Sequence, residues 1–240
     1  VNAKLPKTDK VGVLVYSGGV RGLSLDAADR HGVPLPEFSI ETSAKFKEIL
    51  GDDLRVTNPL DAAGFMNQKL ESIIEMVTAI QKDPNIGMIL FQEDLPPSEG
   101  INDANKRRTK RVLDTMKEFQ ENFLDKGGKP IGLISPASAD LTAFSRDARK
   151  QFPNIPVLSE PNRAFKALRA AFTYQDRVRE TRELPPVNAS KPSEVIEATL
   201  AKLSGDQSLV LSEPESKGLV CSYGIKSPKE EFAKTSSDAA

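Results

Sequence analysis

The chain has 240 residues, of which 38% are hydrophobic and 28% charged, and its 33 Lys and Arg residues nearly balance its 34 Asp and Glu residues. The formal net charge of −1 gives no overall positive field, so we expect neither a nucleic-acid partner nor a membrane surface. No apolar run reaches the roughly 18 residues that a membrane-spanning helix needs, and we expect no signal peptide at the start of the chain. The chain has a single cysteine, Cys221, which cannot form an internal disulfide, and this favours a cytoplasmic protein. It also has a single histidine, His31, which argues against a metal site built from several histidines.

Short apolar runs alternate with longer amphipathic segments over the first part of the chain. The expected strands are residues 11–16, 37–40, 86–91, 130–135 and 156–159. Three of these runs are nearly continuous in Val, Ile and Leu, as in parallel strands that are covered on both faces. Apolar residues recur at helical spacing in residues 70–80, 112–123 and 165–172, which predicts a helix in each of these segments. The alternation predicts an α/β fold, a flavodoxin-like doubly wound parallel sheet with strand order 2-1-3-4-5.

The composition changes after Tyr174, which divides the chain into three expected parts. These are a sheet domain in residues 1–174, a linker with one short helix in 175–208, and a final segment in 209–240. Ser212 and Glu215 have the spacing of a capping box, so a helix is predicted to begin there. Because a segment this short rarely folds alone, we expect it to be the start of a truncated further domain.

The segment Ser17-Gly18-Gly19-Val20-Arg21 joins the first expected strand to the next helix. Glycines allow the backbone to turn tightly and to approach a ligand closely, and the N–H groups at a helix N-terminus attract anions. In a doubly wound fold, the end of the first strand also lies at the crevice where ligands bind. The segment lacks the patterns of a dinucleotide site, a Walker loop and a nucleophile elbow. It therefore predicts either a phosphate site or a tight turn that binds nothing.

Three further polar segments could carry function. The loop Asn58-Pro59-Leu60-Asp61 is either a structural turn or part of a site. Glu93 and Asp94 follow the third apolar strand and could cap a helix, bind a cation or serve as acid and base, so their role stays open. The basic run 106–111 is expected to be a solvated helix face, with phosphate binding, as to a CoA-like ligand, as the alternative.

Taken in chain order, these segments resemble the NDP-forming (ADP-forming) acyl-CoA synthetases, relatives of succinyl-CoA synthetase. The residues that carry the resemblance are Ser17-Gly18-Gly19, Gly32–Ser39, Asn58-Pro59-Leu60-Asp61, Lys129-Pro130-Ile131, Ile155-Pro156-Val157, Pro161–Ala164, Leu211–Lys217 and Tyr223-Gly224-Ile225. By this resemblance, residues 1–174 are similar to the second flavodoxin-like ligase domain of that family, and residues 209–240 to the beginning of its ATP-grasp domain.

The resemblance implies a longer enzyme that makes acyl-CoA from a carboxylic acid, CoA and ATP with Mg²⁺, through a phosphohistidine and an acyl phosphate. In this family, helix N-termini of the two ligase domains hold the phosphohistidine. The match implies that Ser17, Gly18, Gly19 and Val20 bind the phosphoryl group, and that Asn58 and Asp61 line the same pocket. Arg21 stands where the family often has a small residue, so it either adds a contact to the phosphoryl group or blocks the site. The phosphorylated histidine normally lies in another domain. We therefore expect no catalytic residue here, no tightly bound cofactor, and no activity of this part alone.

The implied partners are the CoA-binding, first ligase and ATP-grasp domains of the same synthetase, the carboxylic acid, and further copies of the chain in a homo-oligomer. The acyl group could be acetate-like or feruloyl-like. The alternative is a regulatory ligand-binding module of a degenerate synthetase fused to a protein acetyltransferase, although the intact segments 17–19 and 58–61 favour an enzyme. A free-standing receiver or flavin-binding domain is disfavoured; a receiver needs an acidic cluster after the first strand, and residues 11–19 contain no acidic residue.

Overall fold

The computed structural model describes residues 6–53, 55–62, 69–136, 141–183, 194–203, 211–230, 233, 235 and 237. The chain forms two compact units, Val1–Arg182 and Glu183–Ala240. Within the described ranges, no helix is both long enough and apolar enough to cross a membrane.

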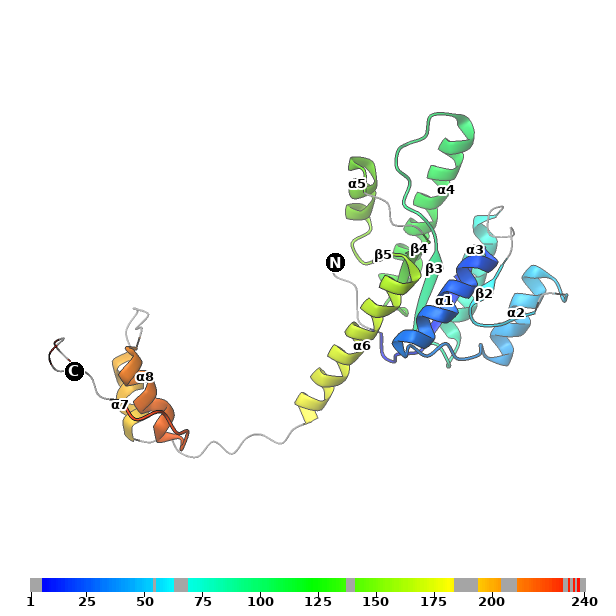
Figure 1. Ribbon diagram of the computed structural model, residues 1–240. Coiled ribbons are helices and arrows are strands. Elements are labelled where there is room, and N and C mark those ends of the chain that lie inside the picture. Colours follow the sequence, from blue (N-terminus) through cyan, green and yellow to red (C-terminus); the bar gives the residue numbers. More distant parts are fainter. Residues whose placement is uncertain are drawn as a thin grey trace. The chain divides into compact units, whose positions relative to one another are not determined.

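The larger unit is built on a five-stranded sheet in which all strands are parallel and follow the order β2-β1-β3-β4-β5 (Figure 1). Its strands are β1 (Val11–Val15), β2 (Leu60–Asp61), β3 (Met88–Gln92), β4 (Ile131–Ser135) and β5 (Val157–Ser159). Every residue of β1 and β3 is buried, because helices cover both faces of the sheet. The predicted α/β class and strand order are thereby confirmed, and the order is that of flavodoxin-like folds.

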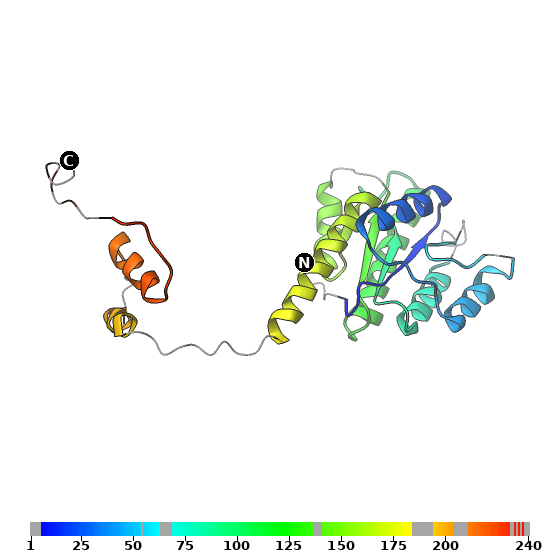
Figure 2. The same ribbon diagram turned by 60° about the horizontal axis from the view of Figure 1, so that its bottom comes forward.

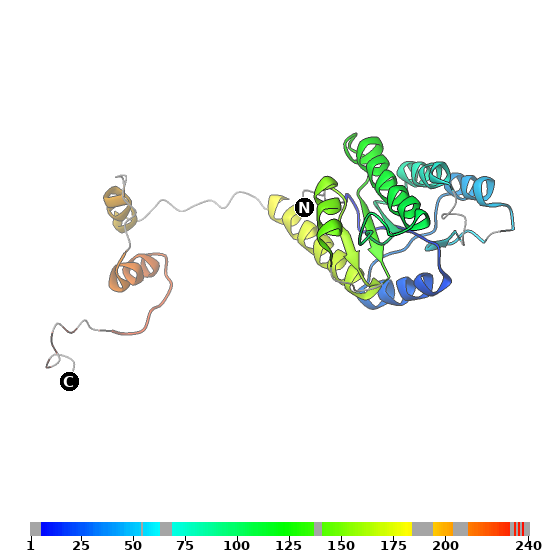
Figure 3. The ribbon, with the colours of Figure 1, turned by 90° about the horizontal axis from the view of Figure 1, so that it is seen from above.

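Helices connect the strands and form one layer on each face of the sheet. They are α1 (Gly18–His31), α2 (Ile40–Leu50), α3 (Leu70–Lys82), α4 (Asp103–Phe119, continued by the π-helical turn Gln120–Leu124), α5 (Ala143–Gln151) and α6 (Pro161–Glu183). Side chains of α1 and α6 pack with β1 in one apolar core, whereas α2, α3 and α4 enclose the other core (Figure 3). The carboxyl ends of the strands therefore meet at one edge, between these two layers.

The prediction of a strand at residues 37–40 is wrong. Ile40 is the first residue of α2, and the Ser39 side chain caps this helix by accepting a hydrogen bond from the Thr42 N–H at 3.2 Å. Phe38 packs edge-to-face against Phe46, with ring centroids 5.1 Å apart, so its apolar character reflects an anchor for a connecting loop. The second strand is instead Leu60–Asp61, inside the segment that we predicted to be a polar loop.

Lys129 ties the beginning of β4 to the end of α3. Its ammonium group donates hydrogen bonds to the Ile80 carbonyl at 2.8 Å and to the Asp83 carbonyl. Burial lowers the pKa of Lys129. Lys129 is one of the residues that carry the family resemblance. Its role in the structure is to cap the C-terminus of α3, by donating hydrogen bonds to carbonyl groups there.

Helix α6 continues past Tyr174 to Glu183, so the first part of the segment predicted to be a linker is helical. The smaller unit contains α7 (Glu194–Leu203) and α8 (Glu213–Ser222), which lie side by side (Figure 2). The predicted capping box is present, and the Ser212 N–H donates to Glu215 Oε2 at 2.8 Å. Residues 184–193 and 204–208 of the predicted linker, and residues 209 and 210 of the predicted final segment, lie outside the described residues.

Candidate functional site

The N-terminus of α1 faces the carboxyl edge of the sheet. Ser17 is extended, the helix begins at Gly18, and both Gly18 and Gly19 are exposed. The Arg21 N–H donates to the Ser17 carbonyl at 2.9 Å, which is the first hydrogen bond of the helix. The N–H groups of residues 18–20 precede this bond and have no partner within the helix, so they form an electropositive end. Val20 contributes only its backbone, because its side chain lies in the apolar core.

Asp61 lies beside this helix end. Strand β2 places it opposite Val15, and the Ala62 N–H donates to the Val15 carbonyl at 2.8 Å. A methyl group added to Gly18 would lie 3.5 Å from Asp61 Oδ2. The structure thus brings the predicted glycine turn and the predicted carboxylate together. A carboxylate in this position repels a free dianion, but it can accept a hydrogen bond from a ring N–H.

Asn58, also predicted to line the pocket, has its side chain engaged by backbone groups. Its Oδ1 accepts a hydrogen bond from the Val13 N–H at 3.0 Å, and its Nδ2 donates to the carbonyls of Val11 and Pro36, each at 2.8 Å. Both N–H donors of the amide are therefore used. Asn58 fixes the path of the loop that leads to Asp61.

Arg21 connects α1 to the same loop. Its Nε donates to the Pro59 carbonyl at 3.2 Å and its Nη2 donates to Thr57 Oγ1 at 3.2 Å. Thr57 Oγ1 in turn donates to the Pro59 carbonyl at 3.0 Å. The Arg21 side chain is thereby directed at the loop before β2, and it holds that loop against the first turn of α1.

A second polar group adjoins the first at the end of β3. The Tyr16 N–H donates to the buried Gln92 side chain at 3.1 Å, which links the ends of β1 and β3. The next residue, Glu93, has a side chain that is only 1% exposed, and it accepts a hydrogen bond from Arg111 Nη2 at 3.0 Å. Arg108 Nη2 lies farther away, at 3.9 Å from Glu93 Oε1.

Burial shifts the acid–base properties of this group. Desolvation raises the pKa of Glu93, with the Arg111 charge acting in the opposite direction. Burial, together with the negative charges of Glu93 and Asp94, raises the pKa of Tyr16, so its hydroxyl stays protonated. Of the roles left open for Glu93, the structure shows an ion pair with α4.

The expectation that residues 106–111 form a solvated face is wrong for Arg111, whereas Arg108 is exposed as expected. Arg111 is 18% exposed and pairs with Glu93, and Arg108 lies 3.8 Å from Asp94 Oδ2. A sequence signal for this existed, because residues three apart lie on the same face of a helix. What the sequence lacked was the acidic partner on a different strand.

Asp94 connects this second polar group to the end of β4. Its Oδ1 accepts a hydrogen bond from the Ser135 hydroxyl at 2.5 Å, and both residues line a cavity of about 480 Å³. Among the described residues, no group of three or more His, Cys, Asp or Glu side chains is arranged to hold a metal ion.

No family model matches the chain, but two curated proteins share part of its sequence. One is an ADP-forming acetate–CoA ligase of Archaeoglobus fulgidus, 32% identical over 87 residues, which are 36% of this chain and 12% of that protein. The other is a trans-feruloyl-CoA synthase from an unidentified prokaryote, 33% identical over 92 residues, which are 37% of this chain and 13% of that protein. The matched part is thus about an eighth of the length of either relative.

Solved structures show the same fold. The protein PH0766 of Pyrococcus horikoshii matches with a TM-score of 0.54 and 21% identity, over 73% of this chain and 38% of that one. A dinucleotide-forming acetyl-coenzyme A synthetase 1 of Candidatus Korarchaeum cryptofilum, solved with phosphate and ADP, matches with a TM-score of 0.53 and 18% identity, over 76% of this chain and 37% of that one. Fold and partial sequence identity agree, and together they relate this chain to part of the ADP-forming acyl-CoA synthetases.

Proposed function

We propose that this chain is part of a longer ADP-forming acyl-CoA synthetase, which makes acyl-CoA from a carboxylic acid, CoA and ATP through a phosphohistidine and an acyl phosphate. The observation that carries the proposal is the exposed glycine N-terminus of α1 beside Asp61, in a chain whose relatives are ligases of this kind. In that enzyme, residues 1–174 are a ligase domain, 175–208 a connection, and 209–240 the beginning of an ATP-grasp domain.

In the proposed site, the N–H groups of residues 18–20 bind the phosphoryl oxygens of a phosphohistidine. Backbone dipoles that already point at the charge stabilise it without reorganisation. Asp61 accepts a hydrogen bond from the ring N–H of the same phosphohistidine, which offsets the repulsion between the carboxylate and the phosphoryl group. Asn58 and Arg21 hold the loop that positions Asp61.

The phosphorylated histidine lies in another domain of the longer protein, and other domains also bind ATP, Mg²⁺ and CoA. This chain alone therefore does not catalyse the reaction. Its partners are those domains, the carboxylic acid and, in a homo-oligomer, further copies of itself. The two curated relatives are named for acetate and for trans-ferulate, and the proposed acid is of one of these two kinds.

Intact-mass analysis of the longer protein tests this function. Mg²⁺ and ATP are expected to add one acid-labile phosphoryl group, which is lost when CoA and the correct acid are supplied. A Gly19→Glu variant places a carboxylate at the helix end and is expected to slow that loss. Gly22→Ala, in a position where a methyl group meets nothing within 4 Å, serves as the control.

Two outcomes would contradict the proposal. Turnover by this chain alone would show that it holds its own catalytic centre. A protein that forms no phosphoryl adduct under any of these conditions would favour the regulatory alternative, in which the turn at residues 17–21 senses a ligand.

A further inference from the structure

The cavity beside Asp94 has the size and lining of a ligand site. It lies between the segment that follows β3 and the first turns of α4 and α5, and is called here the α4–α5 cavity. Its walls are largely apolar and include Leu95, Pro97, Ile101 and Val157. Its volume of about 480 Å³ falls within the roughly 300–1,000 Å³ of small-molecule sites. An acetate ion would leave most of this space empty, whereas an acid with a bulky apolar body would bury that body against the walls.

Arg108 supplies a cation on the wall of this cavity. Its guanidinium lies 3.8 Å from Asp94 and 3.9 Å from Glu93, which is longer than a hydrogen bond. Glu93 instead accepts its short hydrogen bond from Arg111. Within the described parts of the chain, the Arg108 guanidinium therefore makes no hydrogen bond, and the side chain is 58% exposed. A planar guanidinium with unused donors binds a carboxylate through two parallel hydrogen bonds.

Asp94 limits the charge that the cavity accepts. The Ser135 hydroxyl fixes this carboxylate on the wall, where it is 40% exposed. A second carboxylate on the ligand would meet Asp94, and Arg108 offers only one fork of donors. The charges of the wall therefore favour an acid with a single carboxylate.

The cavity also adjoins the proposed phosphate site. Asp94 follows β3, and its charge acts on Tyr16, the residue that precedes Ser17 at the start of the glycine turn. Both the cavity and the N-terminus of α1 thus lie at the carboxyl edge of neighbouring strands, where doubly wound folds bind their ligands.

We propose that the α4–α5 cavity binds the carboxylic acid substrate and that this acid is a monocarboxylic acid with a bulky apolar body, its carboxylate on Arg108. The inference rests on the proposed function, because it takes the bound acid to be a substrate. It goes further by naming the class of acid and the residue that recognises it.

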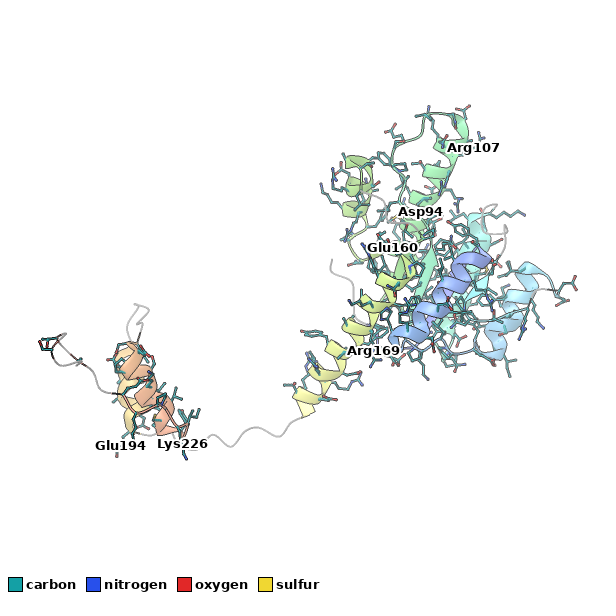
Figure 4. All side chains as sticks on the ribbon, in the orientation of Figure 1. Asp94, Arg107, Glu160, Arg169, Glu194 and Lys226 are labelled. Atoms are coloured by element: carbon teal, nitrogen blue, oxygen red, sulfur yellow. The ribbon has the colours of Figure 1, made fainter. Side chains whose placement is uncertain are left out.

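Calorimetric titration of this chain with trans-ferulate, phenylacetate, acetate and succinate tests the inference. At least one of the two bulky acids is expected to bind, whereas acetate and succinate give no measurable heat at the same concentrations. Arg108→Gln is expected to weaken binding about tenfold or more, the usual effect of losing a hydrogen bond between charged groups. Arg107→Gln is the matched control, since Arg107 is exposed on the same helix and its side chain makes no ion pair or hydrogen bond to another described residue (Figure 4).

A second variant fills the cavity. Ser159 is exposed at the end of β5 and lines the cavity, so Ser159→Phe is expected to abolish binding of the bulky acid while leaving the thermal unfolding midpoint nearly unchanged. The inference is overturned if neither bulky acid binds, if both arginine variants weaken binding equally, or if succinate binds as well as they do.

Titration of the same preparations with inorganic phosphate separates this inference from the proposed function. Arg108→Gln is expected to leave phosphate affinity unchanged, because the N-terminus of α1 supplies the phosphate donors. If phosphate binds and the bulky acids do not, the inference about the cavity fails and the proposed function stands. If the acids bind as expected and phosphate binds neither to the wild-type chain nor to Asp61→Asn, the cavity inference is supported and the phosphate site is contradicted.

Discussion

Replacing Asp61 with asparagine is expected to strengthen the binding of inorganic phosphate to this chain. The carboxylate oxygen lies 3.5 Å from the position that a methyl group on Gly18 would take. For an order-of-magnitude estimate, we take about 6 Å between the charge of a phosphate held by the helix N–H groups and the Asp61 carboxylate. Two charges on the phosphate and one on the carboxylate then repel each other by about 1.4 kcal/mol in a water-like medium, which corresponds to about tenfold in affinity.

The measurement is a titration of wild-type chain and Asp61→Asn with inorganic phosphate, followed by chemical shifts of the backbone amides of residues 18–20. Salt screens the repulsion over about 8 Å at physiological ionic strength, so the gain is expected to shrink as sodium chloride is added. Asp26→Asn removes the same charge from an exposed position farther along α1 and is expected to change the affinity by much less. Unchanged or weaker phosphate binding by Asp61→Asn, with the fold intact, would refute this reasoning.

The same logic gives three further predictions. Because burial raises the pKa of Glu93, protonated Glu93 stabilises the folded state below the ordinary carboxyl pKa, and this contribution is lost as the pH rises through the raised value. The difference in unfolding free energy between wild type and Glu93→Gln should therefore fall as the pH rises above the ordinary carboxyl pKa, and a flat difference in urea titrations would contradict it. Gly22→Ala should stabilise the chain by about 0.5–1 kcal/mol, as a methyl group there meets nothing within 4 Å. Gly87→Ala should destabilise it by about 1–3 kcal/mol, because its methyl group would lie 2.9 Å from the Thr8 carbonyl; equal melting temperatures for the two variants would contradict both expectations. Asn102→Ala should cost about 1 kcal/mol, since its side chain caps α4, while Asn102→Asp should retain most of the stability in the same thermal melts.

Local patterns were sufficient to predict most of the sheet. The Val-, Ile- and Leu-rich runs of β1, β3 and β4 are buried on both faces, and such runs have few other uses in a chain of this composition. The prediction of a strand at residues 37–40 fails because Phe38, which makes this segment apolar, packs on Phe46 of the following helix instead of in the sheet. A two-residue strand such as β2 carries too little pattern to be distinguished from a loop.

The candidate site was predictable only where its residues are neighbours in sequence. The Ser17-Gly18-Gly19 turn carries its own signal, because glycine and a helix start occur together. The pairing of Glu93 with Arg111 depends on how α4 lies over the end of β3, and no spacing within one segment encodes it. The same holds for Asn58, whose amide is used up by two other segments of backbone.

The side chain of Asn58 also has a consequence for the solubility of the chain. Strand β2 is much shorter than β1, which would leave part of the outer rim of β1 open to pairing with a strand of another molecule. The Asn58 amide bonds to the N–H of Val13 and the carbonyl of Val11, much as a neighbouring strand would. The Pro34 carbonyl accepts from the Val11 N–H at 3.0 Å. One side chain and one loop thus shield the most hydrophobic strand of the sheet from intermolecular β-pairing and aggregation.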